Sequence, residues 1–67
     1  MIELELNGVP YRVPPGVSLQ DLVSRLGLAG QAVAVAVNRE VVPRQQWSER
    51  CPQARDKVDI VRAIGGG

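Results

Sequence analysis

The chain has 67 residues, with eight basic and seven acidic side chains and a formal net charge of +1. This length corresponds to one domain near the lower size limit for folding on a hydrophobic core, and 45% hydrophobic residues suffice for such a core. Charges of both signs are interspersed, which argues against nucleic acid or an anionic membrane as a partner.

The first predicted element is a β-hairpin. Residues 2–6 alternate between apolar and acidic side chains and residues 9–13 alternate again, as in two half-buried strands. Asn7-Gly8 between them is the preferred pair for a two-residue turn, because both positions accept a positive φ. Pro10 cannot donate a ladder hydrogen bond, so the second strand is expected at a sheet edge or with a bulge.

A single main helix is predicted after the Pro-Pro-Gly sequence of residues 14–16. Ser18 is a suitable N-cap, and Asp21 places a negative charge in the first turn. Four apolar residues recur at helical spacing: Leu19, Leu22, Val23 and Leu26. Gly27 is placed to end the helix. Because parallel strands need a long connection, the helix is expected to cross from one strand to a parallel neighbour.

Three further strands are predicted in the second half of the chain. Residues 32–37 alternate valine with alanine and are apolar on both faces, which is typical of a strand that has neighbours on both sides and packs on a helix. Residues 38–40 form a polar turn into the short strand Val41-Val42. Residues 44–49 are expected to include a helical turn around Trp47, and residues 58–64 form the last strand. Trp47 is interpreted as a residue that covers the edge of the core, in preference to an interface hot spot.

This order of elements predicts an α+β fold of the β-grasp, or ubiquitin-like, type. A mixed sheet of about four to five strands would pack on one main helix. We expect residues 1–64 to form this domain and residues 65–67 to form a flexible C-terminal tail.

The chain contains one cysteine, no histidine and no long apolar segment. The run of residues 32–37 is far too short to cross a bilayer, and the N-terminus lacks the pattern of a signal peptide. A single cysteine excludes an internal disulfide and is typical of the reducing cytoplasm, where we expect the protein. Cys51 precedes a proline in a polar loop, and we expect an ordinary thiol there.

These residue types do not predict a catalytic centre. Without histidine a Cys-His nucleophile is impossible within the chain, and no metal cluster is expected. The acidic residues are scattered singly, and no glycine-rich loop precedes a helix in the manner of a phosphate site. The chain is therefore predicted not to be an enzyme and to bind no metal or cofactor itself.

The candidate functional residues are the last three, Gly65, Gly66 and Gly67. Glycine is entropically costly to order, so a folded domain gains no stability by ending in this way. An extended glycine backbone is thin enough to be threaded into the active site of another protein, and it ends in an unhindered carboxylate. A carboxylate is a poor electrophile, so its use requires activation, for example adenylation by a partner enzyme with ATP.

Two segments resemble a known family. Residues 38–47 match the pattern Asn-x-x-x-Val-Pro-Arg-x-x-Trp, and residues 58–67 form a strand that runs into the glycines. Both are similar to the ThiS family of sulfur carriers of thiamine biosynthesis, and the resemblance covers the whole chain. One departure is Ala54-Arg55-Asp56, where relatives often have Asp-Gly-Asp, so the type of this turn stays open.

The resemblance implies a β-grasp fold and a Gly67 carboxylate that is adenylated and converted to a thiocarboxylate. It further implies a ThiF-type adenylating enzyme, which uses ATP and Mg²⁺, and a sulfur source linked to a cysteine desulfurase. Thiazole synthase would accept the sulfur. The alternatives left open are the small subunit of molybdopterin synthase, a ubiquitin-like modifier that forms isopeptide bonds through Gly67, and an interaction domain with an inert tail.

Residues in the last two strands are candidates for contact with partner proteins, because these strands lead into the tail. The candidates are Val41, Val42, Ile60, Arg62 and Ile64. For Arg62 two interpretations are open, namely a solvated strand residue or a contact with an acidic patch on a partner.

Overall fold

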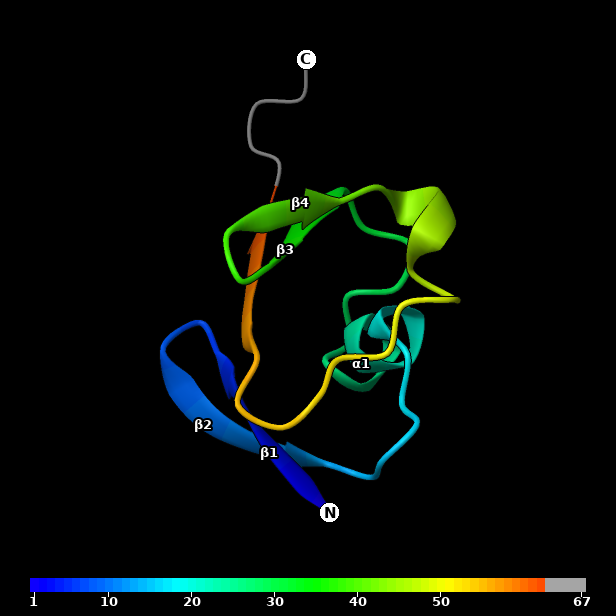
Figure 1. The fold of residues 1–67 in the computed structure, drawn as a ribbon. Helices are drawn as coiled ribbons and strands as arrows, with labels where there is room; N and C mark the ends of the chain where they lie inside the picture. The colour runs from blue at the N-terminus through cyan, green and yellow to red at the C-terminus, as the bar shows by residue number, and fades with distance from the viewer. Residues whose placement is uncertain (63–67) are drawn as a thin grey trace.

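The computed structural model describes residues 1–62. Over this range the chain forms β1 (Ile2–Leu6), β2 (Val9–Val13), α1 (Leu19–Arg25), β3 (Val33–Val37), β4 (Glu40–Val42), the 3₁₀ helix η1 (Arg44–Gln46) and β5 (Lys57–Arg62) (Figure 1). The predicted order of elements is confirmed. Residues 63 and 64 of the predicted last strand, and the predicted tail, lie outside the described residues.

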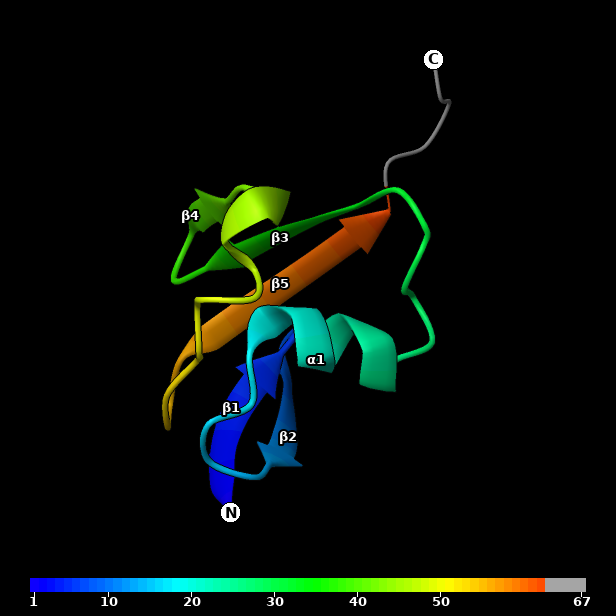
Figure 2. The ribbon, with the colours of Figure 1, turned by 90° about the vertical axis from the view of Figure 1, so that its right-hand side faces the viewer.

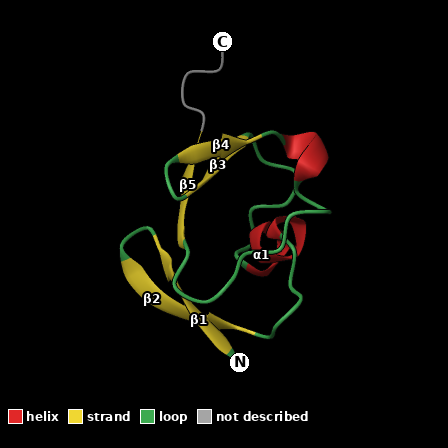
Figure 3. Cartoon of the chain, in the orientation of Figure 1, coloured by secondary structure: helices red, strands yellow, loops and turns green. Residues whose placement is uncertain are grey.

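The strands form one mixed sheet in the order β2-β1-β5-β3-β4. β5 is parallel to β1 and antiparallel to β3, and the β1–β2 and β3–β4 pairs are antiparallel hairpins. Figure 3 shows α1 on one side of this sheet. The predicted α+β, β-grasp class is confirmed, and β2 lies at a sheet edge, as its proline predicted.

The crossover through α1 differs from the prediction. The helix connects β2 to β3, and these strands are not neighbours, because β1 and β5 lie between them. β2 and β3 do run in the same direction, since each is antiparallel to one member of the parallel β1–β5 pair. The prediction that the helix forms a long connection between two strands of the same direction is therefore correct. The gap it leaves in the sheet is filled by β1 and by the last strand of the chain.

α1 begins at a capping box. The Ser18 hydroxyl accepts a hydrogen bond from the Asp21 N–H at 3.1 Å, and the Asp21 carboxylate accepts one from the Ser18 N–H at 3.3 Å. These bonds satisfy donors at the helix N-terminus that have no partner within the helix. The helix buries Leu19, Leu22 and Val23. Gly27 follows at a φ of 73°, so the predicted start, apolar face and end of the helix are confirmed.

Both hairpins turn over two residues at positive φ. Asn7 and Gly8 have φ of 51° and 82°, and Asn38 and Arg39 have φ of 51° and 70°. Positive φ at both positions is the requirement of a type I′ turn, whose twist suits the flanking strands. The first turn is confirmed, and the second is shorter than predicted, because Glu40 already belongs to β4.

The turn before β5 resolves the departure at residues 54–56. Arg55 has a φ of 71°, a left-handed conformation in which glycine is favoured. The Asp56 carboxylate accepts hydrogen bonds from the Gln53 N–H at 2.8 Å and from Asn38 Nδ2 at 3.2 Å. The aspartate shared with the family pattern thus holds the turn together, and Arg55 adopts the conformation that a glycine would take there.

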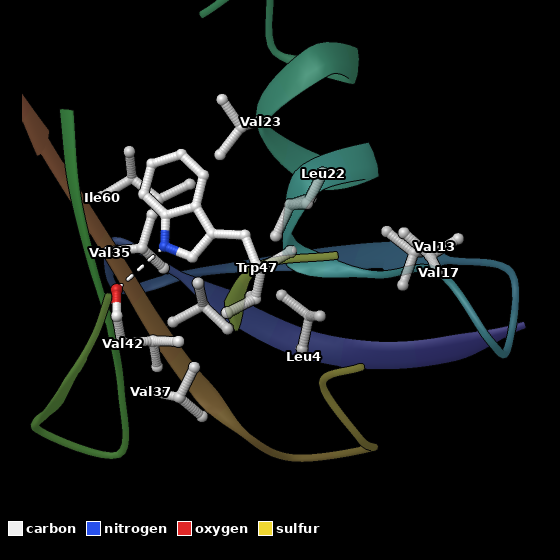
Figure 4. Packing of buried hydrophobic residues seen from close by; sticks show 12 residues of the cluster. Leu4, Val13, Val17, Leu22, Val23, Val35, Val37, Val42, Trp47 and Ile60 are labelled. Atoms are coloured by element: carbon white, nitrogen blue, oxygen red, sulfur yellow. Dashed lines mark hydrogen bonds between the residues drawn. The ribbon is translucent and has the colours of Figure 1, made fainter. Parts of the chain in front are cut away.

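Trp47 lies inside the core. Its side chain is 2% exposed, and its indole N–H donates to the Val42 carbonyl at 2.9 Å. Figure 4 shows the ring between Val23 of α1 and the strand residues Val35 and Ile60. The interpretation as a residue of the core is correct, but the ring lies inside the core and not at its edge. η1 is the predicted helical turn beside it. Because its one polar atom is satisfied, the largest side chain of the core is buried without an unpaired donor.

Candidate functional site

The predicted functional residues Gly65, Gly66 and Gly67 lie outside the described residues, as does the predicted partner contact Ile64. The structure describes the strand from which they continue. β5 ends at Arg62 and lies in the middle of the sheet, between β1 and β3. The surface around β5 is therefore the candidate contact surface for a protein that binds the C-terminal residues.

Four small apolar side chains lie on the face of the sheet that points away from α1. Val35, Val37, Val42 and Ile60 are buried on the helix side, and side chains alternate between the two faces of a strand. The opposite face therefore carries Ala34, Ala36, Val41 and Val61, which we call the outer-face patch. Its members are contiguous, because Ala34 pairs with Val61 and Ala36 pairs with Val41.

The outer-face patch is open to solvent where its valines lie. Val41 is 74% exposed and Val61 is 60% exposed. A cluster of exposed apolar side chains beside a strand that leads to the candidate functional residues is typical of a protein interaction surface. Val41 was expected as a partner contact. Val61 was missed, although the alternation of residues 58–62 already places it on the face opposite Ile60.

Two of the predicted partner contacts are corrected by the structure. Val42 is 4% exposed and Ile60 is 7% exposed, and both side chains pack in the core against α1 and Trp47. They are not available on the surface, because in an alternating strand only every second side chain faces outward. Val41 and Arg62 stay predicted partner contacts.

Arg62 is held by Gln31, which precedes β3. The guanidinium donates to Gln31 Oε1 through Nε at 3.1 Å and also through Nη2. Arg44 donates to the Gln31 carbonyl at 3.1 Å and lies 5.3 Å from the centroid of the Trp47 ring. Among residues 1–62 the ion pair found is Arg12–Glu3, so neither guanidinium is neutralised by a carboxylate there. Gln31 therefore gathers two positive charges at the end of β5.

Two turn asparagines fix β5 in the sheet. Asn38 Oδ1 accepts a hydrogen bond from the Lys57 N–H at 3.0 Å, at the start of the strand. Asn7 Oδ1 accepts one from the Ile60 N–H at 2.8 Å, near its end. Both residues were expected only to turn the chain. Their side chains additionally take the place of backbone acceptors, so the strand that leads to residues 63–67 is held at its first and fourth residues.

The remaining features of the described residues concern Cys51, metal-ligating side chains and apolar helices. Cys51 is exposed, and its thiol lies 3.7 Å from the Gly16 carbonyl, in a polar loop as expected. Within residues 1–62 no group of three or more histidine, cysteine, aspartate or glutamate side chains is arranged to hold a metal ion. Among the same residues, no helix is long and apolar enough to cross a membrane.

Comparison with protein families decides the affiliation. The model of the ThiS family matches residues 4–67, which include the last three residues of β1, the four other strands and the terminal glycines. The chain belongs to the ThiS family. The resemblance of residues 38–47 and 58–67 is thereby confirmed at the level of the family.

Known relatives of this ThiS-family chain agree with that affiliation. The crystal structure of the thiamine biosynthesis protein (ThiS) of Geobacter metallireducens is similar with a TM-score of 0.82 and 29% identity, over 98% of this chain and 100% of that chain. The sulfur carrier protein ThiS of Bacillus subtilis is 33% identical over 66 residues, 96% of this chain and 98% of that protein. The thiazole synthase of Magnetococcus marinus is 36% identical over 66 residues, which are 98% of this chain and 20% of that protein.

Proposed function

We propose that this chain is the sulfur carrier for the thiazole moiety of thiamine. The observation that carries the proposal is the match to the ThiS family over residues 4–67, because it includes the terminal glycines as well as the folded domain. The similar Bacillus subtilis protein bears the name sulfur carrier protein, which supports the same role. In this role the chain is a protein co-substrate, and its reacting group is the carboxylate of Gly67.

The chemistry takes place in two steps in a ThiF-type partner. An oxygen of the Gly67 carboxylate attacks the α-phosphorus of ATP, which the partner holds with Mg²⁺, and pyrophosphate leaves. A desulfurase forms a persulfide from cysteine, and a thiol reductant, itself oxidised to a disulfide, releases the outer sulfur as sulfide. Sulfide then attacks the Gly67 carbonyl carbon, displaces AMP and leaves a thiocarboxylate. Residues 65–67 have no side chains, so nucleophiles reach the terminal carbonyl without steric hindrance.

Thiazole synthase is the proposed acceptor of the sulfur. The Magnetococcus marinus protein of that name contains a segment similar to nearly the whole of this chain. Fusion of two protein units raises the effective concentration of one for the other, which is useful for units that react together. The relationship supports a functional pairing of carrier and synthase.

Intact-protein mass spectrometry tests the proposal directly. After incubation with the ThiF-type enzyme, ATP and a sulfur source, the mass is expected to rise by the difference between sulfur and oxygen, located on Gly67. A carrier-deficient strain that expresses this chain should then grow without thiamine, and added thiazole should replace the chain. An unmodified mass would argue for another function. So would the finding that the chain restores molybdopterin synthesis in a deficient strain but not the synthesis of thiazole.

The outer-face patch is proposed to contact the adenylating enzyme, which leads to a prediction for Val41. Val41→Asp is expected to raise the KM of that enzyme for the carrier about tenfold. Loss of a buried valine side chain from an interface costs roughly 1.5 kcal/mol of binding free energy, and about 1.4 kcal/mol corresponds to a tenfold change in affinity. The unfolding midpoint should hardly change, because the side chain is 74% exposed.

Val9→Asp is the matched control for this measurement. Val9 is 62% exposed and lies on β2, at the opposite edge of the sheet from β4. Its substitution adds the same charge to the protein and should leave the KM unchanged. Equal effects of the two variants would show that the added charge, and not the patch, is responsible.

A further inference from the structure

β5 extends beyond the strand that flanks it on one side. The β1–β5 register contains the pairs Glu5–Lys57 and Leu6–Val58, after which the chain turns away at Asn7 and Gly8. On its other side β5 is paired with β3 as far as Arg62. Figure 2 shows β5 running past the end of β1 toward its own C-terminal end. The last part of β5 therefore has a neighbour on one side only.

The backbone groups that point to the open side are identified by the hydrogen bonds around them. The N–H and C=O of one strand residue point to the same side, and successive residues alternate. Lys57 pairs with Asn38, at the turn that follows β3, so Asp59 and Val61 also point toward β3. Ile60 points the other way, because its N–H donates to Asn7 Oδ1 at 2.8 Å.

Two backbone groups follow on the open side, the carbonyl of Ile60 and the N–H of Arg62. β1 has ended at Leu6, and within residues 1–62 neither group has a backbone partner. Asn7 thus supplies the last acceptor of the β1–β5 ladder through its side chain. The Ile60 carbonyl and the Arg62 N–H beyond Asn7 form a short strand edge, which we call the open edge of β5. A longer β1 would pair with it.

We propose that an extended segment of the adenylating partner pairs with this edge, in the position that β1 leaves vacant. Unpaired strand edges are templates for strand addition, and peptide recognition by this mode is widespread. Two apolar side chains flank the edge: the half-buried Leu6 at the end of β1 and the exposed Val61 on the outer face. The occupant is therefore an extended segment with apolar side chains.

The position of the edge gives the pairing a mechanistic consequence. Arg62 is the donor of the edge, and Gly67 follows it by five residues. A hydrogen bond at Arg62 holds the strand immediately before the tail, which restricts where the reacting carboxylate is presented. In the similar Magnetococcus marinus protein the carrier segment is part of the thiazole synthase chain, so the chain itself holds the synthase near the carrier. A separate adenylating enzyme has no such link and must bind the carrier through its surface, so we assign the edge to that enzyme. This inference rests on the proposed function.

Methylation of the backbone nitrogen of Arg62, introduced by chemical synthesis of the chain, is the decisive variant. It removes the donor and blocks the edge but keeps the guanidinium, so the contact with Gln31 is retained. Because the nitrogen bonds nothing within residues 1–62, the unfolding midpoint is expected to stay within the error of the unmodified synthetic chain. The KM of the ThiF-type enzyme should rise about fivefold or more, as for a lost interface hydrogen bond.

Two controls separate the backbone from other effects. Arg62→Ala keeps the N–H, so a smaller rise in KM is expected from it than from N-methylation. Methylation of the Val61 nitrogen, which points toward β3, should instead lower the unfolding midpoint. In ¹⁵N-labelled protein the Arg62 amide should exchange with solvent faster than the Val61 amide, and it should become protected when the enzyme is added.

The outcomes distinguish this inference from the function on which it rests. If the unmodified chain is adenylated but N-methylation of Arg62 leaves the KM unchanged, the edge is not a docking site and the function stands. If the unmodified chain is not adenylated at all, both are wrong. Protection of the Arg62 amide in the isolated protein that increases with its concentration would assign the edge to a second copy of the chain and would overturn the inference.

Discussion

Deletion of Gly66 and Gly67 is expected to abolish sulfur transfer while leaving the stability of the domain unchanged. The proposed reaction takes place at the carboxylate of Gly67, and a shortened tail would present its carboxylate about two residues, roughly 7 Å, short of the same position. Effective catalysis needs the reacting atoms within about 3–3.5 Å of each other, so no partial activity is expected. Within residues 1–62 the last member of the buried core is Ile60, and the deletion touches none of these residues.

Two measurements check this prediction together. The truncated chain should show no mass increase with the adenylating enzyme, ATP and a sulfur source, and it should fail to support growth of a carrier-deficient strain without thiamine. Its thermal unfolding curve should coincide with that of the full chain. Complementation by the truncated chain would contradict the proposed function, because it would show that the terminal glycines are dispensable.

Replacement of Trp47 by alanine is expected to remove most of the stability of the domain. Truncation of a buried tryptophan costs about 3–5 kcal/mol, whereas a domain of this size has a total of about 3–10 kcal/mol. Trp47 is 2% exposed, and it contacts both α1 and the sheet (Figure 4). Its loss would also leave the Val42 carbonyl without its indole donor and Arg44 without the ring beneath its guanidinium.

Trp47→Phe is the matched variant, because it keeps most of the buried ring and removes the N–H. Denaturant unfolding should show a loss of about 1–3 kcal/mol for phenylalanine, from the unsatisfied carbonyl and the smaller ring. The phenylalanine variant should still accept sulfur in the mass assay. If Trp47→Ala lowers the free energy of unfolding by less than Trp47→Phe, the indole is not the centre of the core.

The site shows where sequence reasoning was sufficient and where it was not. Alternation in β5 places Ile60 and Val61 on opposite faces, but it does not say which face meets the helix. Burial of Ile60 and exposure of Val61 follow only when α1 is placed against the sheet. The same holds for the alanines of β3, because alternation alone does not say which face of the strand they occupy. The structure places them on the outer face, where they complete the outer-face patch.

Hydrogen bonds between residues far apart in the chain could not be predicted from the sequence either. Asn7 is recognisable as a turn residue, because a two-residue hairpin favours asparagine followed by glycine. Its bond to Ile60 spans 53 positions of the chain, and no local pattern indicates it. Gln31 likewise has no local signal. Arg62 becomes its neighbour only through the β3–β5 pairing, and Arg44, which follows β4, only through the β3–β4 pairing.

By itself the sequence determined the hairpins, the capped helix and the β-grasp order, and it singled out the C-terminal glycines as the candidate reacting residues. These features depend on alternation, capping and turn preferences, which act between residues a few positions apart. Only the tertiary structure decided that β5 inserts between β1 and β3 and that Val42 and Ile60 are internal. It also revealed that β5 has an open edge before the tail. These facts depend on which distant segments pack together, and that choice minimises the free energy of the whole domain rather than of any one segment.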